Sequence, residues 1–121
     1  MAKTTKKDFE LFKKECQKWI DYFGLKDWRV VYKHGTPISD DANASFESCI
    51  EDGIIMITLN TDIDNKNQLK LSAFHEVVEG MLLIRLMHFI DKRYVDENML
   101  EAEIHSIVRT LENTVFRDVK P

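Results

Sequence analysis

A long apolar segment that carries three closely spaced ionisable residues is the feature that most constrains how this sequence folds. Residues 69–90 are mostly hydrophobic, yet His75, Glu76 and Glu79 interrupt them in the pattern H-E-x-x-E. On an α-helix, residues four apart lie about 40° apart around the axis, so His75 and Glu79 point the same way. Because burying such groups without partners is costly, the fold must supply partners for them.

A bound metal ion is one such partner, and the spacing suits it. The pattern is that of the zinc-binding helix H-E-x-x-H with glutamate in place of the second histidine. Catalytic zinc sites combine three protein ligands, drawn from imidazole nitrogens and carboxylate oxygens, with a water molecule. His75 and Glu79 are therefore candidate ligands, and Glu76 is a candidate general base acting on that water. The alternative is an ordinary helix whose polar residues lie at the solvent edge.

Composition narrows the class of protein. The chain has 121 residues, of which 44% are hydrophobic and 31% charged, as in a typical globular domain. Its net charge of -4 argues against nucleic acid as the main partner. The charges within residues 69–90 argue against a membrane span. Cys16 and Cys49 form no C-x-x-C pair, and we interpret them as small apolar residues in a reducing, cytoplasmic compartment.

Hydrophobic periodicity predicts an α+β fold. We expect a disordered basic leader over residues 1–7 and a single domain over residues 8–121. The predicted elements, in order, are a helix over residues 8–23, a strand over 28–32, a hairpin of strands 44–50 and 54–59, a buried motif helix over 68–90, and a last helix from Asp96 to about residue 116.

Local signals support several of these elements. Thr5 and Asp8 resemble a capping box, and Gly24 is well placed to end the first helix in the left-handed conformation. Asp-Gly at 52–53 favours a hairpin, whose second strand is apolar on both faces and is therefore expected to be central or well covered. His34 precedes Gly-Thr-Pro and is expected in a loop. Gly80 costs roughly 1 kcal/mol inside a helix, which favours the close approach of another backbone or of a ligand beside Glu79; the alternative is a plain packing contact.

The last predicted helix carries a second pair of polar residues. Glu101 and His105 lie four residues apart, beside a stripe expected to be buried that consists of Leu100, Ile104, Ile107, Val108, Leu111 and Val115. A short turn before this helix predicts antiparallel packing on the motif helix. His105 would then complete a ligand set with His75 and Glu79. Glu101 is the rival third ligand, or a group that orients His105. The set also fits non-haem iron, so spacing alone leaves zinc and iron open.

The order of elements resembles the compact core of the zincin metallopeptidases. More narrowly, the chain resembles small phage- and prophage-encoded metallopeptidases that carry H-E-x-x-E, with a tryptophan-containing strand like 27–30 and a last helix like 105–113. This resemblance implies zinc held by His75, Glu79 and His105, with Glu76 catalytic. The commoner zincins have histidine where this chain has Glu79, and the extra carboxylate weakens the pull of the ion on a water proton.

Two functions follow from these expectations. The first is a zinc-dependent hydrolase, expected to be a metallopeptidase, in which Glu76 is the general base and the partner is a peptide or protein substrate. The alternative is a catalytically inactive zincin-like module of phage origin with a binding or structural role. In either case we expect a monomer or weak dimer in the cytoplasm, which is that of the host if the chain is phage-encoded.

Overall fold

The first long helix begins and ends where local sequence signals predict. The structure, a computed structural model, describes residues 2–37, 42–84 and 97–119. Helix α1 spans Lys6–Tyr22, and the reciprocal hydrogen bonds of Thr5 and Asp8 form the predicted capping box at its start. Gly24 has a φ of +67°, the left-handed conformation that glycine adopts at little cost. The face of α1 that carries Phe12, Cys16 and Trp19 is fully buried.

The predicted disordered leader is instead part of the fold. Strand β1 (Ala2–Lys3) pairs antiparallel with β5 (Asp62–Ile63). Thr4 is buried, and its hydroxyl donates a hydrogen bond of 2.8 Å to the carbonyl of Asn60. Two-residue strands leave no periodic pattern in a sequence, so these backbone and side-chain bonds could not be foreseen from the charges of the segment.

Three strands form the main sheet in the order β2, β4, β3. The predicted hairpin is confirmed as β3 (Ala44–Cys49) and β4 (Ile54–Asn60), which pair antiparallel. Strand β2 (Arg29–Gly35) pairs with β4 in parallel. As predicted, β4 is central, and its residues Ile55, Ile57 and Leu59 are almost fully buried beneath the helices.

His34 lies in strand β2, and the prediction of a loop there was wrong. The strand continues to Gly35 because β4 offers backbone partners along its whole length. The imidazole ring stacks on Phe9 at 4.9 Å, and Nε2 lies 2.6 Å from the hydroxyl of Thr4. Since that hydroxyl donates its single proton to Asn60, His34 must donate to Thr4. This histidine joins the N-terminal segment to the sheet.

The motif segment is helical but not uniformly so. After the short turn η1 (Lys66–Gln68), helix α2 spans Leu69–Val77, and the π-helical segment η2 spans Val78–Leu82. A hydrogen bond of 3.0 Å from the amide of Leu83 to the carbonyl of Val78 marks this wider turn. The rest of the helix predicted to reach residue 90 lies outside the described residues. Wide turns of this kind occur often at functional sites.

Gly80 lets η2 lie directly against the sheet. A Cβ atom at this position would lie 2.8 Å from Cγ of Phe46 and 2.9 Å from Cδ1 of Ile55. The close approach at Gly80 is therefore the alternative, a packing contact with side chains of β3 and β4, and not the approach of a backbone or a ligand. It fixes the distance between the motif helix and the sheet.

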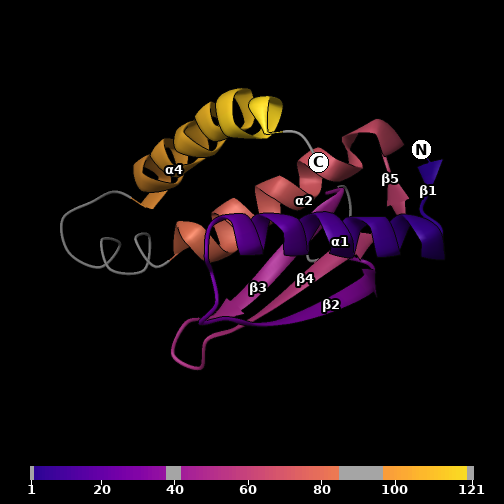
Figure 1. Cartoon of the computed structure of the whole chain (residues 1–121), viewed down its shortest axis with the longest axis horizontal. Coiled ribbons are helices and arrows are strands. Elements are labelled where there is room, and N and C mark those ends of the chain that lie inside the picture. The colour runs from indigo at the N-terminus through magenta and orange to yellow at the C-terminus, as the bar shows by residue number, and fades with distance from the viewer. Residues whose placement is uncertain (1, 38–41, 85–96, 120–121) are drawn as a thin grey trace.

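The last helix returns across the motif helix. Helix α4 spans Glu97–Leu111 and continues as the π-helical segment η3 (Glu112–Phe116), whereas the predicted start at Asp96 lies outside the described residues. Figure 1 shows α4 running in the general direction opposite to α2, which confirms the predicted return of the last helix. Ile104 and Val108 are buried, but Ile107, which was predicted in the same buried stripe, is 41% exposed. The face of α4 that packs against the core is therefore narrower than the stripe of apolar residues along the helix.

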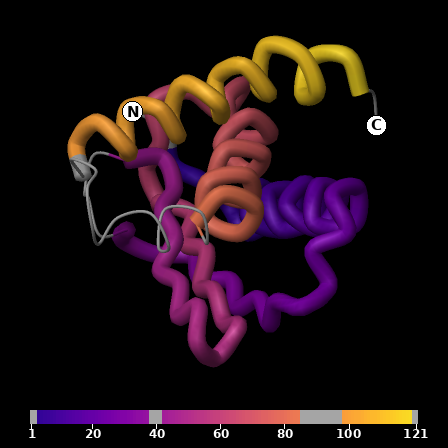
Figure 2. Tube along the Cα trace, turned by 90° about the vertical axis from the view of Figure 1, so that its left-hand side faces the viewer, coloured from indigo at the N-terminus to yellow at the C-terminus, as the bar shows by residue number. Residues whose placement is uncertain are grey.

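The elements form three layers. The sheet lies on one side, α1 and α2 cover one of its faces side by side, and α4 crosses over the far side of these two helices (Figures 1 and 2). The predicted α+β layout of an N-terminal helix, a small three-stranded sheet, a buried motif helix and a C-terminal helix is thereby confirmed. Within the described ranges, no helix has both the length and the hydropathy needed to cross a membrane.

Candidate metal centre

Three ionisable side chains from the motif helix and the last helix converge on one point. His75, Glu79 and His105 each offer a potential ligand atom, and these three atoms lie within 4.8 Å of one another. Nε2 of His75 lies 2.7 Å from Oε2 of Glu79, and Nε2 of His105 lies 3.0 Å from Oε1 of the same carboxylate. The structure thus brings together the three residues that the sequence singled out as candidate ligands.

Two helices position this cluster. His75 lies in the last turn of α2 and Glu79 in the wide turn η2, so the pair spans one turn of a single helix. His105 comes from α4, where Ile104 and Val108 on either side of it are buried in the core. Because these apolar neighbours fix the rotation of α4, the imidazole of His105 faces Glu79.

Glu101, the rival third ligand, does not join the cluster. The residue is exposed on α4, whereas His105 one turn later is half-buried. Among the residues that the structure describes, the group able to hold a metal ion consists of His75, Glu79 and His105 without it. Of the two candidates on the last helix, the geometry favours the histidine.

Glu112 contacts the cluster and was not recognised in the sequence. Its Oε2 lies 3.0 Å from Nδ1 of His75, on the side of the ring opposite Glu79. Glu112 follows His105 by seven residues, which is close to two helical turns and places both on one face of the last helix. This spacing could have indicated that Glu112 lies near the site. Its contact with His75 was nevertheless not predictable, because 37 residues separate the two in the chain.

Glu76 is buried next to the cluster, at the edge of an open pocket. Only 7% of its surface is exposed, and this burial is the main reason that its pKa rises to about 7. The charge of His75 opposes the rise, while those of Glu79 and Glu112 add to it. A carboxyl group with a pKa near neutrality can both accept and return a proton at physiological pH.

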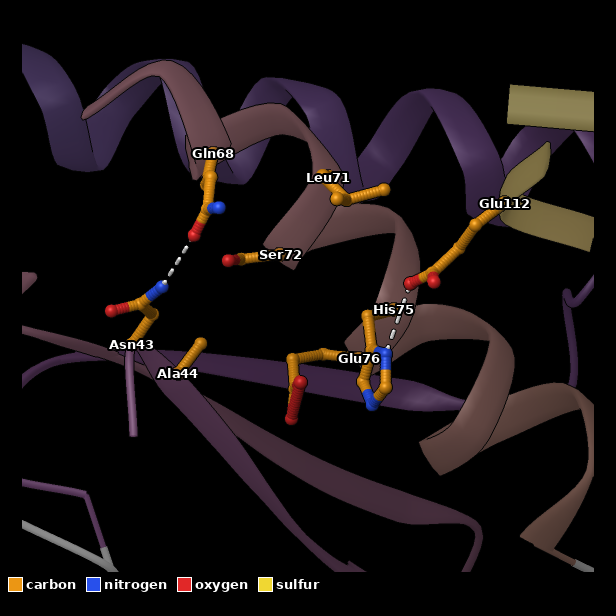
Figure 3. Close-up of a pocket in the computed structure, with 8 residues that line it drawn as sticks. All are labelled: Asn43, Ala44, Gln68, Leu71, Ser72, His75, Glu76 and Glu112. Atoms are coloured by element: carbon orange, nitrogen blue, oxygen red, sulfur yellow. Dashed lines mark hydrogen bonds and ion pairs between the residues drawn. The ribbon is translucent and has the colours of Figure 1, made fainter. Parts of the chain in front are cut away.

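The pocket lies between the motif helix, the start of β3 and the end of the last helix. It has a volume of about 270 Å³ and is lined by Asn43, Ala44, Gln68, Leu71, Ser72, His75, Glu76 and Glu112. Figure 3 shows Ser72, His75 and Glu76 projecting from α2 on the pocket side, with Glu112 reaching His75 from the other helix. At the opposite end, the side-chain amide of Asn43 donates to Oε1 of Gln68 over 3.4 Å. A small polar substrate group entering here would lie beside Glu76.

The charges of the cluster are strongly coupled. The hydrogen bond with Glu79 is the main cause that raises the pKa of His75 to about 9, against the opposing effect of burial. Burial alone would raise the pKa of Glu79, but the hydrogen bond and charge of His75, followed by those of His105, lower it below its ordinary value. Without a metal ion, a protonated His75 therefore neutralises Glu79.

The donor set fits a zinc ion. Two imidazole nitrogens and one carboxylate form a known catalytic zinc set. Bonds of about 2.0–2.1 Å in a tetrahedral site hold ligand atoms roughly 3.3–3.4 Å apart. In the structure Nε2 of His75 lies 2.7 Å from Oε2 of Glu79 and Nε2 of His105 lies 3.0 Å from the other oxygen, Oε1, while the three potential ligand atoms all lie within 4.8 Å of one another. Small rotations of these partly buried side chains would bring one carboxylate oxygen and the two ring nitrogens to the separations that the ion requires.

Comparison of the chain with family models, with curated proteins and with solved structures finds no significant match in any of the three.

Proposed function

We propose that this protein is a zinc-dependent hydrolase of the metallopeptidase class. The observation that carries the proposal is the convergence of His75, Glu79 and His105 within 4.8 Å, beside a buried Glu76 on an open pocket. A purely structural zinc site has four protein ligands and needs no general base. Three potential ligands beside a buried carboxyl group are an arrangement suited to metal-assisted hydrolysis.

His75, Glu79 and His105 would hold the ion. When bound, zinc polarises a substrate carbonyl and lowers the pKa of a water molecule towards neutrality. The lowered pKa of Glu79 keeps its side chain ionised, the form in which a carboxylate binds a metal ion. His75 must release the proton on Nε2 to bind the ion, and its contact with Glu112 through Nδ1 is undisturbed by that loss.

Glu76 would move the proton during hydrolysis. Its carboxylate accepts a proton from the attacking water and returns it to the leaving nitrogen. Burial raises the pKa of Glu76 to about 7, so both protonation states are accessible near neutral pH. A general base of this kind contributes typically 10²–10⁴-fold to the rate.

The sheet offers a place for an extended substrate. Among the described strands, β3 lies at an edge of the main sheet, and its first residue, Ala44, lines the pocket together with Asn43. A peptide that adds to a sheet edge obtains affinity from backbone hydrogen bonds. A peptide bound along β3 would pass Glu76, which lines the same pocket as Asn43 and Ala44. We therefore propose peptides or proteins as substrates. We also propose that the protein is a monomer or a weak dimer.

The thiols bear on where the protein works. Cys16 is buried and Cys49 is exposed, and both are free. Exposed free thiols persist in reducing compartments. We therefore propose that the protein acts in the cytoplasm.

Replacement of Glu76 separates the hydrolase from a binding module without turnover. Zinc-loaded wild type and Glu76→Gln are incubated with a broad peptide library, and the products are identified by mass spectrometry. We expect wild type to cut at least one peptide, and Glu76→Gln to bind zinc equally well but lose about 10²–10⁴-fold in rate.

Full activity in Glu76→Gln contradicts the assigned role of this residue. If zinc-loaded wild type cuts no peptide in the library, the hydrolase proposal fails and the module without turnover replaces it. Omission of zinc from wild type, with a chelator present, is the control for contaminating peptidases.

A further inference from the structure

We propose that Glu112 is a positioning residue that holds His75 in the one tautomer able to bind the metal ion. This inference rests on the metal site of the proposed function, but it concerns a residue outside the ligand set. Glu112, at the start of η3 where the last helix continues, contacts the far side of the His75 ring.

The imidazole of His75 lies between two carboxylates. Nε2 faces Oε2 of Glu79 at 2.7 Å, and Nδ1 faces Oε2 of Glu112 at 3.0 Å. The first nitrogen points towards the candidate metal position and the second away from it. The two contacts therefore have separate tasks: one belongs to the ligand set, and the other can persist when an ion is bound.

The chemistry of the two groups assigns the tautomer. An ionised carboxylate has no proton to donate, so a hydrogen bond to Glu112 requires a proton on Nδ1 of His75. In a neutral imidazole, a proton on Nδ1 leaves the lone pair on Nε2, where the ion would bind. Without Glu112, the ring could carry its proton on Nε2 and direct it at the metal position. Partners that fix the ring in this way typically change metal affinity by 10–100-fold.

The fold holds Glu112 in place. Its side chain is only 16% exposed, and it begins the segment η3. Four residues later, Phe116 packs against Phe74 with ring centroids 5.3 Å apart, and Phe74 is the neighbour of His75 in α2. The two helices are thus joined by an aromatic contact close to the hydrogen bond, so Glu112 has little freedom to leave the ring.

The experiment compares Glu112→Ala and Glu112→Gln with wild type in the intact chain. Glu103→Ala is the matched control, because it removes the same charge from an exposed site on the same helix. The Kd for zinc is measured by competition with a chromophoric chelator. We expect Glu112→Ala to bind zinc about 10–100-fold more weakly than wild type, and the control to bind like wild type. Glu112→Gln should recover part of the affinity, since its amide oxygen can still accept from Nδ1.

A second measurement reads the tautomer directly. Long-range ¹H–¹⁵N spectra distinguish protonated, unprotonated and metal-bound ring nitrogens, and assignment uses His75→Ala. In zinc-loaded wild type, Nδ1 of His75 should carry the proton and Nε2 the metal. A role confined to stability would lower the unfolding midpoint of Glu112→Ala and leave its zinc affinity unchanged, which overturns the inference.

The outcomes separate this inference from the proposed function. If wild type binds no zinc, the metal site fails and the role of Glu112 fails with it. If wild type binds zinc and the folded Glu112→Ala binds it as tightly, the role of Glu112 alone is wrong. If Glu112→Ala does not fold, Glu112→Gln decides the question. A Glu112→Gln protein that binds zinc with wild-type affinity while Nδ1 of its His75 carries no proton would also overturn the inference. If wild type binds zinc but hydrolyses no peptide, and Glu112→Ala binds zinc weakly, the positioning role of Glu112 is supported and only the proposed hydrolase activity is rejected.

Discussion

Nε2 of His105 lies 3.0 Å from Oε1 of Glu79, although 26 residues separate the two in the chain. The contact joins the last helix to the motif helix at the wide turn η2. Glu79 is thereby shared between two histidines, one on its own helix and one on α4. The Glu79 carboxylate is the centre of the site, and each histidine contacts a different one of its two oxygens.

Replacement of the two candidates on the last helix distinguishes the third ligand. We expect His105→Ala to weaken zinc binding strongly, since it removes a neutral imidazole donor from the cluster. Glu101→Ala should bind zinc like wild type, because Glu101 is exposed outside that cluster. The Kd of each variant is measured by chelator competition. Loss of binding in Glu101→Ala with retention in His105→Ala would reverse the assignment.

Metal content of protein purified without added metal tests the site as a whole. We expect about one zinc ion per chain in wild type, as three ligands and an open position require. His75→Ala should carry none, because it lacks the ligand that shares a turn with Glu79. Elemental analysis by mass spectrometry measures zinc and iron together and so also decides which metal is present. His34→Gln, a histidine substitution outside the cluster, should retain the wild-type content, and equal zinc in His75→Ala would place the metal elsewhere.

The metal-free protein should lose stability as pH rises. The pKa of His75 is about 9 in the folded state against an ordinary 6.5, so its contribution is complete below pH 6.5 and disappears as pH rises through 9. The pKa of Glu76 is about 7 against an ordinary 4.5, so the folded state also binds more protons than the unfolded state between these values. Both groups act in one direction, and urea midpoints of chelator-treated protein should fall between pH 5 and 9.

The lowered pKa of Glu79 changes stability in the opposite direction with pH. Its contribution is present above its ordinary pKa of 4.5 and is lost as pH falls below that value, which sets the acid limit of stability. His75→Asn removes the titration of the ring and should flatten the decline above pH 7. An increase in the stability of metal-free wild type from pH 6 to 9 is incompatible with these shifts. Zinc should stabilise the protein more at higher pH, because its ligands bind deprotonated.

Gly80→Ala should destabilise the fold although alanine is the better helix former. Alanine gains roughly 1 kcal/mol in helix propensity. Its Cβ would, however, lie 2.8 Å from Cγ of Phe46 and 2.9 Å from Cδ1 of Ile55, and overpacking costs typically 1–3 kcal/mol. We expect a net loss of about 1 kcal/mol, measured as a lower urea midpoint at an unchanged m-value. Gly35→Ala is the control, since its Cβ would meet only the flexible end of Lys33 at 3.4 Å; a Gly80→Ala protein as stable as this control would show that η2 can move away from the sheet.

Features that depend on near neighbours were predictable from the sequence. The capping box of Thr5 and Asp8, the positive φ of Gly24 and the hairpin turn at Gly53 all arise within a few residues of the chain. The same holds for the apolar pattern that placed β4 at the centre of the sheet. Local propensity and tertiary structure agree at these positions, and such agreement is what makes a prediction succeed.

Features that depend on distant partners were missed. The parallel pairing of β2 with β4, the pairing of β1 with β5, and the contact of Glu112 with His75 all join segments far apart in the sequence. The wide turn η2 was missed for another reason: a single i to i+5 turn leaves the hydrophobic period almost unchanged. The gathering of His75, Glu79 and His105 was foreseen because helical spacing and the return of the last helix suffice to bring them together.

The position of Glu79 and His105 on two helices gives a bound ion the mechanical role of a removable cross-link. A permanent link between these residues would close a loop of about 26 residues and, by the chain-entropy relation that applies to disulfides, destabilise the unfolded chain by roughly 3–4 kcal/mol. An ion provides such a link only while α4 stays docked. Detachment of α4 would remove one of the three ligands, so the rate at which the protein exchanges a bound metal should rise with the frequency at which its last helix lifts from the body.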